Sequence, residues 1–103
     1  MYIKDNIPNS FTLDGKECSV QHAYFPHGNR DHIRIWDDEG CAAKLGMNLS
    51  PPELMDLLGP KEIYVKQDMI DLLIPYLSKL GFEDTTKRMR YGYGATAQIW
   101  TLK

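Results

Sequence analysis

Three cations, Lys87, Arg88 and Arg90, precede alternating tyrosines and glycines in the segment KRMRYGYGATAQIW near the end of this 103-residue chain. Clustered Lys and Arg bind phosphate groups, and aromatic rings offer faces on which unpaired bases stack. Residues 87–103 are also the one basic region of an acidic chain, because they contain none of its fourteen Asp and Glu residues. Nucleic-acid binding is therefore one function to weigh.

The alternation within this segment separates its charges from its rings. Side chains of a β-strand point to its two faces in turn, so Arg88 and Arg90 share one face. The opposite, core-facing row comprises Met89, Tyr91, Tyr93, Ala95, Ala97 and Ile99. The rings would then lack positive charge beside them, and the arginines also fit an edge hairpin that resists edge-to-edge pairing. Lys87, Arg88 and Arg90 are the candidate contacts with a partner or with nucleic acid.

Three histidines recur at five-residue intervals close to several acidic residues. They are His22, His27 and His32, and the acids are Asp31, Asp37, Asp38 and Glu39. Imidazole and carboxylate groups suit a divalent metal, and zinc needs three or four ligands that converge at about 2 Å. Equal spacing across strand, loop and strand matches no ligand motif, so we predict no metal ligand. A metal-dependent enzyme stays as the second alternative, because the sequence does not show whether the three rings converge.

The other reactive residues do not form a catalytic set. Cys18 and Cys41 are too few for a disulfide scaffold, and we expect two free, half-buried thiols without an activating partner. The segment DDEG at 37–40 holds paired carboxylates, but its place between two strands predicts a solvated hairpin tip. The glycines form no phosphate-binding loop. We therefore predict no catalytic residue, no cofactor and no enzymatic activity.

The first half of the chain is typical of β-strands. Asp14-Gly15 suits a two-residue type I′ turn, in which both central residues need positive φ, and predicts a hairpin of 9–13 with 16–25. Residues 26–31 have the composition of a loop. A second hairpin is expected to pair 32–37 with 41–49. The later strand of this hairpin places on one face Cys41, Ala43, Leu45, Met47 and Leu49.

A first, short helix is predicted at 50–58. Ser50 and Glu53 form a capping box, and Gly59-Pro60 ends the helix after barely two turns. Its apolar stripe comprises Leu54, Leu57 and Leu58. The strand EIYVK follows at 62–66.

A second, longer helix is predicted at 68–80, with Gly81 as its stop. Its apolar face, which we expect to pack on the sheet, comprises Met69, Leu72, Leu73, Tyr76, Leu77 and Leu80. Pro75 lies inside this helix and lacks the N–H that would bond one turn back. We therefore expect either a kink or a later start near Asp71.

These elements predict a single α+β domain over residues 1–103. The expected sheet is mostly antiparallel, with an N-terminal meander of two hairpins, one middle strand and a closing hairpin within 82–102. The helices at 50–58 and 68–80 are expected on one face of it.

Several features between residues 38 and 103 point to a family. They are the turn Asp38-Glu39-Gly40, a strand ending in Asn48-Leu49, EIYVK with Lys66, Lys79-Leu80-Gly81-Phe82, Glu83-Asp84-Thr85, and Gly92 before a final apolar strand. In this order the chain resembles a family of small uncharacterised bacterial proteins often carried on plasmids, phages and conjugative elements. The family pattern has glycine after the threonine, where this chain has Thr86. The resemblance implies fold and provenance, since the family has no assigned activity.

We therefore expect a non-enzymatic accessory or interaction protein of a mobile genetic element, which acts by contact with an unidentified protein partner. Nucleic-acid binding through Lys87, Arg88 and Arg90 is the alternative. No stretch approaches the roughly 18 apolar residues of a membrane span, so we expect a cytoplasmic protein without membrane contact.

Overall fold

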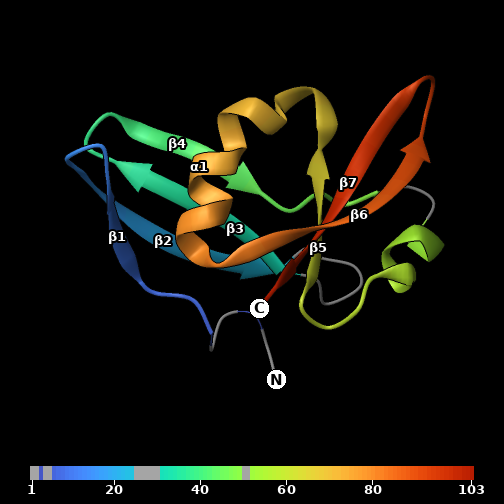
Figure 1. Ribbon diagram of the computed structural model, residues 1–103, viewed down its shortest axis with the longest axis horizontal. Coiled ribbons are helices and arrows are strands. Elements are labelled where there is room, and N and C mark those ends of the chain that lie inside the picture. Colours follow the sequence, from blue (N-terminus) through green and yellow to red (C-terminus); the bar gives the residue numbers. More distant parts are fainter. Residues whose placement is uncertain (1–2, 4–5, 25–30, 50–51) are drawn as a thin grey trace.

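A computed structural model of the protein describes residue 3 and the ranges 6–24, 31–49 and 52–103 (Figure 1). Its strands are β1 (Ser10–Leu13), β2 (Lys16–Tyr24), β3 (Asp31–Asp37), β4 (Gly40–Leu45), β5 (Glu62–Lys66), β6 (Phe82–Tyr91) and β7 (Ala95–Leu102). Its helices are the 3-10 helices η2 (Pro52–Leu57) and η3 (Gln67–Met69) and the α-helix α1 (Ile70–Leu80). All strand pairs are antiparallel. The predicted α+β class is confirmed.

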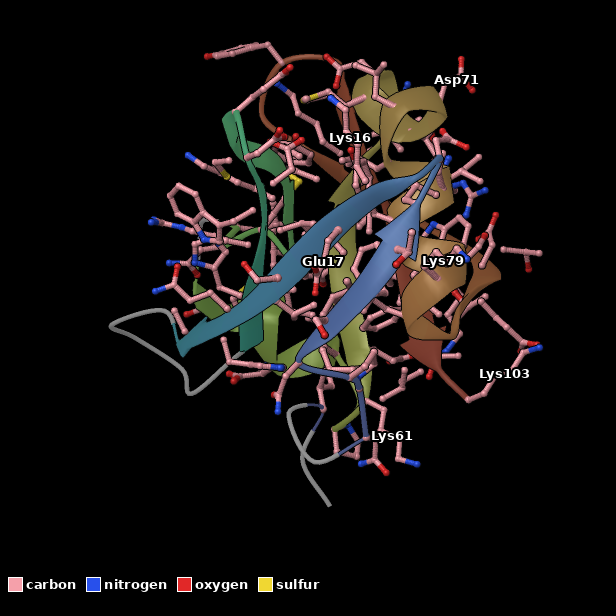
Figure 2. All side chains as sticks on the ribbon, turned by 90° about the vertical axis from the view of Figure 1, so that its left-hand side faces the viewer. Lys16, Glu17, Lys61, Asp71, Lys79 and Lys103 are labelled. Atoms are coloured by element: carbon pink, nitrogen blue, oxygen red, sulfur yellow. The ribbon has the colours of Figure 1, made fainter. Side chains whose placement is uncertain are left out.

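The first four strands form one antiparallel meander in the order β1-β2-β3-β4. The predicted turn between β1 and β2 is confirmed, because Asp14 and Gly15 have φ of 51° and 78°. In Figure 2, Lys16 and Glu17 mark the start of β2, and α1, labelled by Asp71 and Lys79, lies beside β1. The loop predicted at 26–31 falls mostly outside the described residues, and Asp31 already belongs to β3.

The last three strands form a second sheet in the order β5-β7-β6. The strand predicted at 62–66 and the closing hairpin are therefore confirmed. The single sheet expected from the sequence is divided into two, with β7 as the central strand of the smaller one.

Strand β4 is shorter and less regular than predicted. It ends at Leu45 instead of Leu49, and its register with β3 shifts so that Ala43 faces Ile35 while Cys41 faces Trp36. Ala42 is thus an extra residue in a bulge, which reverses the side on which the preceding residue lies. Both thiols are free, as predicted, but the half-buried environment was wrong for each, because Cys41 is exposed and Cys18 is buried.

The helix predicted at 50–58 is a 3-10 helix at Pro52–Leu57. The expected cap, Ser50, lies outside the described residues. A 3-10 helix has three residues per turn, so Met55 and Leu58, three apart, face the core together. Leu57, expected on the buried stripe, is 60% exposed instead.

The longer helix begins with the 3-10 turn η3, and α1 proper begins at Ile70. This agrees with the expected later start near Asp71. Gly81 ends the helix in the predicted left-handed conformation, with φ of 90°. Of the predicted apolar face, Leu73, Leu77 and Leu80 are buried and Tyr76 is half-buried, but Met69 and Leu72 are 42% and 69% exposed.

Two groups of buried side chains hold these elements together. The first lies between the first sheet, α1 and one face of the second sheet, and includes Ile33, Ile35, Leu45, Leu77 and Trp100. The second lies on the other face of the second sheet, against η2, and comprises Leu49, Met55, Leu58, Tyr64, Ala97 and Ile99. The two helices therefore cover opposite faces of the second sheet, not one face as expected (Figure 1). None of the described helices is long and apolar enough to cross a membrane.

Strand β6 contains a bulge that its own side chains close. Asp84 faces Trp100 and Arg88 faces Gln98, so the residues 85–87 stand opposite Ile99 alone. Arg88 donates to both carboxylate oxygens of Asp84, at 2.8 and 2.9 Å. The same carboxylate accepts the Thr86 N–H at 2.8 Å. The Thr85 hydroxyl donates to the Ile99 carbonyl at 2.6 Å, which ties the bulge to β7.

Thr86 adopts a backbone conformation that suits glycine. Its φ is 68°, in the left-handed region that a β-branched residue rarely enters. Glycine adopts this conformation without a steric penalty, so Thr86 is not the residue that suits the position best.

Replacing Thr86 with Gly is expected to raise the free energy of unfolding by about 0.5–1 kcal/mol. Relief of left-handed strain, roughly 1–2 kcal/mol, exceeds the extra unfolded-state entropy of glycine, roughly 0.5–1 kcal/mol. Urea unfolding of wild type and T86G measures the difference. Asp14→Gly is the matched control and should gain less, because Asp tolerates its φ of 51°. A less stable T86G would contradict this account of the bulge.

Replacing Arg88 with Gln is expected to cost about 0.5–1 kcal/mol at neutral pH, since the ion pair is part-exposed. The hydrogen bonds from Arg88, then that from the Thr86 backbone, hold the pKa of Asp84 below its ordinary value. A depressed carboxyl pKa stabilises the fold above the unfolded value, near 3.9, and that stability disappears as pH falls through the folded value. The difference in unfolding free energy between wild type and R88Q should therefore shrink below about pH 4. A difference that stays constant down to pH 2 would show that the pair contributes no electrostatic stability.

Candidate functional site

Two of the three predicted contact cations lie next to an acidic side chain of the same chain. Arg88 is bound to Asp84, and the Lys87 ammonium lies 3.8 Å from the Glu62 carboxylate. Arg90 is exposed and makes no ion pair within the described ranges. Among the described residues, the closing hairpin thus presents one unpaired arginine and one lysine whose long, exposed pair is weak, instead of three free cations.

The ring-bearing side of this hairpin follows the predicted alternation only as far as the turn. Met89 and Tyr91 are half-buried against the second core group, as expected. Tyr93 was predicted to face the core, but it is fully exposed at the tip between Gly92 and Gly94. Both glycines have positive φ, 59° and 76°, so the strand alternation does not continue through the turn.

The histidines that the structure describes lie on opposite sides of one sheet. His22 faces Ile33 across the β2–β3 ladder, so its side chain is on the buried side. His32 faces Ala23, one residue further along each strand, and therefore lies on the opposite side. His27 is outside the described residues. Within the described part, no three His, Cys, Asp or Glu side chains gather as a metal site.

Cys18 is buried in the core, and the acidic turn at 37–40 is held by a hydrogen bond and an ion pair. Burial raises the pKa of the Cys18 thiol, which disfavours the reactive thiolate. The predicted hairpin tip at 37–40 is confirmed, because the Asp37 carboxylate accepts the Glu39 N–H at 2.8 Å within the turn. The Glu39 carboxylate lies 3.5 Å from the Lys16 ammonium and links the two turns of the first sheet.

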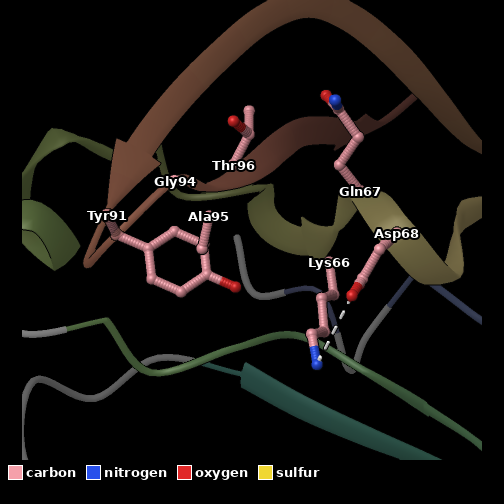
Figure 3. Close-up of a pocket in the computed structure, with 7 residues that line it drawn as sticks. All are labelled: Lys66, Gln67, Asp68, Tyr91, Gly94, Ala95 and Thr96. Atoms are coloured by element: carbon pink, nitrogen blue, oxygen red, sulfur yellow. Dashed lines mark ion pairs between the residues drawn. The ribbon is translucent and has the colours of Figure 1, made fainter.

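A small polar hollow of about 270 Å³ lies between the end of β5 and the β6–β7 turn. Figure 3 shows the Tyr91 ring directed toward the pair formed by Lys66 and Asp68, whose charged atoms are 3.9 Å apart. Gln67, Gly94, Ala95 and Thr96 complete its lining. Both charged side chains are largely exposed, so this pair is weak and the hollow is open to water.

A larger, apolar groove of about 600 Å³ lies between β4 and the start of the long helix. We call it the β4–α1 groove. Its lining is Cys41, Ala42, Ala43, Lys44, Gly46, Met47, Val65, Lys66, Met69, Leu72 and Leu73. Its volume is in the range of sites that hold a ligand or several side chains of a partner. The groove collects the two residues of the predicted helix face, Met69 and Leu72, that the core leaves exposed.

No direct signal for this groove is present in the amino-acid sequence. A stripe at helical spacing does not tell which of its residues reach the core and which flank it, because a domain of this size usually needs the whole stripe. The signal that was present is the width of the stripe. Of its six predicted members, Met69 and Leu72 are the two that remain exposed.

Comparisons with protein-family models, with curated proteins and with solved structures found no match to this chain. The resemblance to small proteins of mobile genetic elements stays a prediction.

Proposed function

We propose that this is a non-enzymatic interaction protein that acts through protein–protein contact, with the β4–α1 groove as its contact surface. The observation that carries the proposal is the exposure of Leu72 and Met69 along one wall of a 600 Å³ apolar groove. A role as an accessory protein of a mobile genetic element agrees with this contact function and rests on the resemblance alone.

Exposure of Leu72 is unusual for so small a domain. A 103-residue chain buries a modest fraction of its surface and needs most of its large apolar side chains in the core. Leu72 is nevertheless 69% exposed, and Met69 is 42% exposed one turn before it. Large apolar side chains that gather beside a groove mark an interaction site more often than scattered ones do.

The charges at the groove favour an acidic partner segment. Lys44 lies on the β4 wall and Lys66 on the β5 wall. Within the described residues, Lys44 has no ion pair, and the pair of Lys66 with Asp68 is long and exposed. A partner with an apolar anchor flanked by Asp or Glu would fill the groove and meet both lysines.

Anchoring by side chains fits this groove better than addition of a strand to the sheet. β4 is an edge strand of the first sheet and could in principle pair with a partner strand. However, it carries the bulge at Ala42 and the exposed Lys44, which are features that discourage edge pairing. Methionine side chains at the groove, Met47 and Met69, adapt readily to an inserted apolar group.

Selection of random dodecapeptides on the immobilised wild-type protein is expected to enrich an apolar anchor beside acidic residues. Leu72→Glu should weaken these peptides about tenfold or more, because loss of a buried leucine contact costs roughly 1.5–3 kcal/mol. Leu57→Glu is the matched control, since Leu57 is 60% exposed but lies in η2. Both variants should unfold within about 0.5 kcal/mol of wild type.

Two results would count against the proposal. One is enrichment of peptides that bind L72E as well as wild type, which would place the contact elsewhere. The other is a wild-type dimer in sedimentation that L72E dissociates, because the groove would then hold a second copy of the chain.

A further inference from the structure

The first sheet has a second surface, on the side away from the core, which differs from the β4–α1 groove. We call this side the outer face. In β3, Ile33 and Ile35 are fully buried, so the residues between and after them lie on the outer face. These residues are His32, Arg34 and Trp36. Across the ladders they face Ala23, Gln21 and Ser19 on β2, and Lys44 and Cys41 on β4.

Two cations stand directly opposite each other on this face. Arg34 and Lys44 are register partners in the β3–β4 ladder, where like charges destabilise the pair. Neither makes an ion pair to any described residue. The Arg34 Nε–H is buried and has no acceptor among the described residues. Burial first, and then the charges of Arg34 and Lys44, lower the pKa of the neighbouring His32.

An aromatic ring is fixed beside these cations. Trp36 lies two residues from Arg34 on the same side of β3, so about 7 Å separates their positions. Its indole N–H donates to the Gln21 carboxamide on β2 at 2.9 Å. The ring is half-buried and held across two strands, which lowers the entropy lost when a ligand stacks on it. The closing hairpin separates its rings from its cations, whereas the outer face brings them together.

The remaining residues of the outer face are small or polar. Ser19, Gln21 and Lys44 are exposed, and Ala42 and Cys41 are the small residues at the edge. A protein interface usually has a core of large apolar residues, which this face does not offer in its described part. The acid on its β2 strand, Glu17, lies four residues from Gln21, which corresponds to about 13 Å along the strand. The charge near Arg34 is therefore positive.

We propose that the outer face of the first sheet binds single-stranded nucleic acid, with Trp36 stacking on a base and Arg34 and Lys44 contacting phosphate. Single strands are bound by this combination of aromatic faces and cations on a sheet, because every base has a π-face and every nucleotide a phosphate. Duplex DNA does not expose base faces, so stacking on Trp36 selects the unpaired strand. The acidic turn at 37–40 directs the phosphates away from the far end of β3.

Titration with fluorescein-labelled oligothymidylate at low salt tests the proposal by anisotropy and by tryptophan fluorescence. Trp100 is 7% exposed and bonded inside the core, so quenching reports on Trp36. We expect the logarithm of the association constant to fall with the logarithm of the salt concentration. The slope should be about −1.4, from two phosphate contacts on a single strand. Arg34→Gln with Lys44→Gln should flatten this slope and weaken binding about tenfold. Trp36→Leu should weaken it about fivefold or more, in line with loss of base stacking.

The double variant R88Q/R90Q is the matched control, because it removes two arginines from the closing hairpin and should leave binding unchanged. Trp36→Phe keeps a ring and should retain binding, which guards against a Leu variant that fails to fold. Absence of binding at low salt would overturn the proposal. So would equal binding of W36L and wild type, equal binding of a duplex of the same length, or loss of binding in R88Q/R90Q alone. Full competition by polyglutamate would overturn it as well, because the face would then recognise charge without stacking.

Discussion

The central strand β7 has to satisfy two cores at once. Trp100 and Leu102 point into the core shared with α1 and the first sheet, while Ala97 and Ile99 point into the core closed by η2. A strand covered on both faces cannot leave a polar group unbonded. Gln98 is only 7% exposed, and its side-chain oxygen accepts the indole N–H of Trp100 at 2.9 Å. This bond pairs the Trp100 indole N–H with the Gln98 side-chain oxygen inside the doubly covered strand. β5 and β6 flank β7 on its two sides, while α1 and η2 lie over its two faces.

Two local irregularities adapt the edge strands to this arrangement. The bulge in β6 places three residues opposite Ile99 and is closed by Asp84, Thr85 and Arg88. The bulge in β4 turns Cys41 to the exposed side at the edge of the first sheet. Both are single-strand adjustments that leave the partner strand regular. The β6 bulge binds Arg88 to Asp84, so this arginine is not free to bind a ligand. The β4 bulge places Cys41 and Ala42 in one wall of the β4–α1 groove.

Alternation and turn chemistry were sufficient to predict most of the strands, because Asp14-Gly15, the turn at 37–40 and the spacing in EIYVK are local signals. They could not predict that the sheet divides, since the pairing of β5 with β7 joins residues far apart in the chain. They also placed Cys41 and Tyr93 on the wrong side, because a bulge and a glycine turn each reset the alternation. Strand periodicity in HIRIWD does separate Ile33 and Ile35 from Arg34 and Trp36. The sequence therefore indicated which β3 residues lie on the outer face. The position of Lys44 opposite Arg34 became known only from the register of the β3–β4 ladder.

Strand β4 separates the two proposed surfaces and belongs to both of them. Ala43 and Leu45 are buried on its inner side, while Lys44 lies on the outer face and also borders the β4–α1 groove. An acidic partner segment in the groove would neutralise Lys44 and leave Arg34 as the main cation available to phosphate. Both ligands are negatively charged, and like charges repel over about 10 Å at moderate salt, so the two ligands should oppose each other. Linkage requires this opposition to be reciprocal, so nucleic acid on the outer face would weaken an acidic segment in the groove by the same factor.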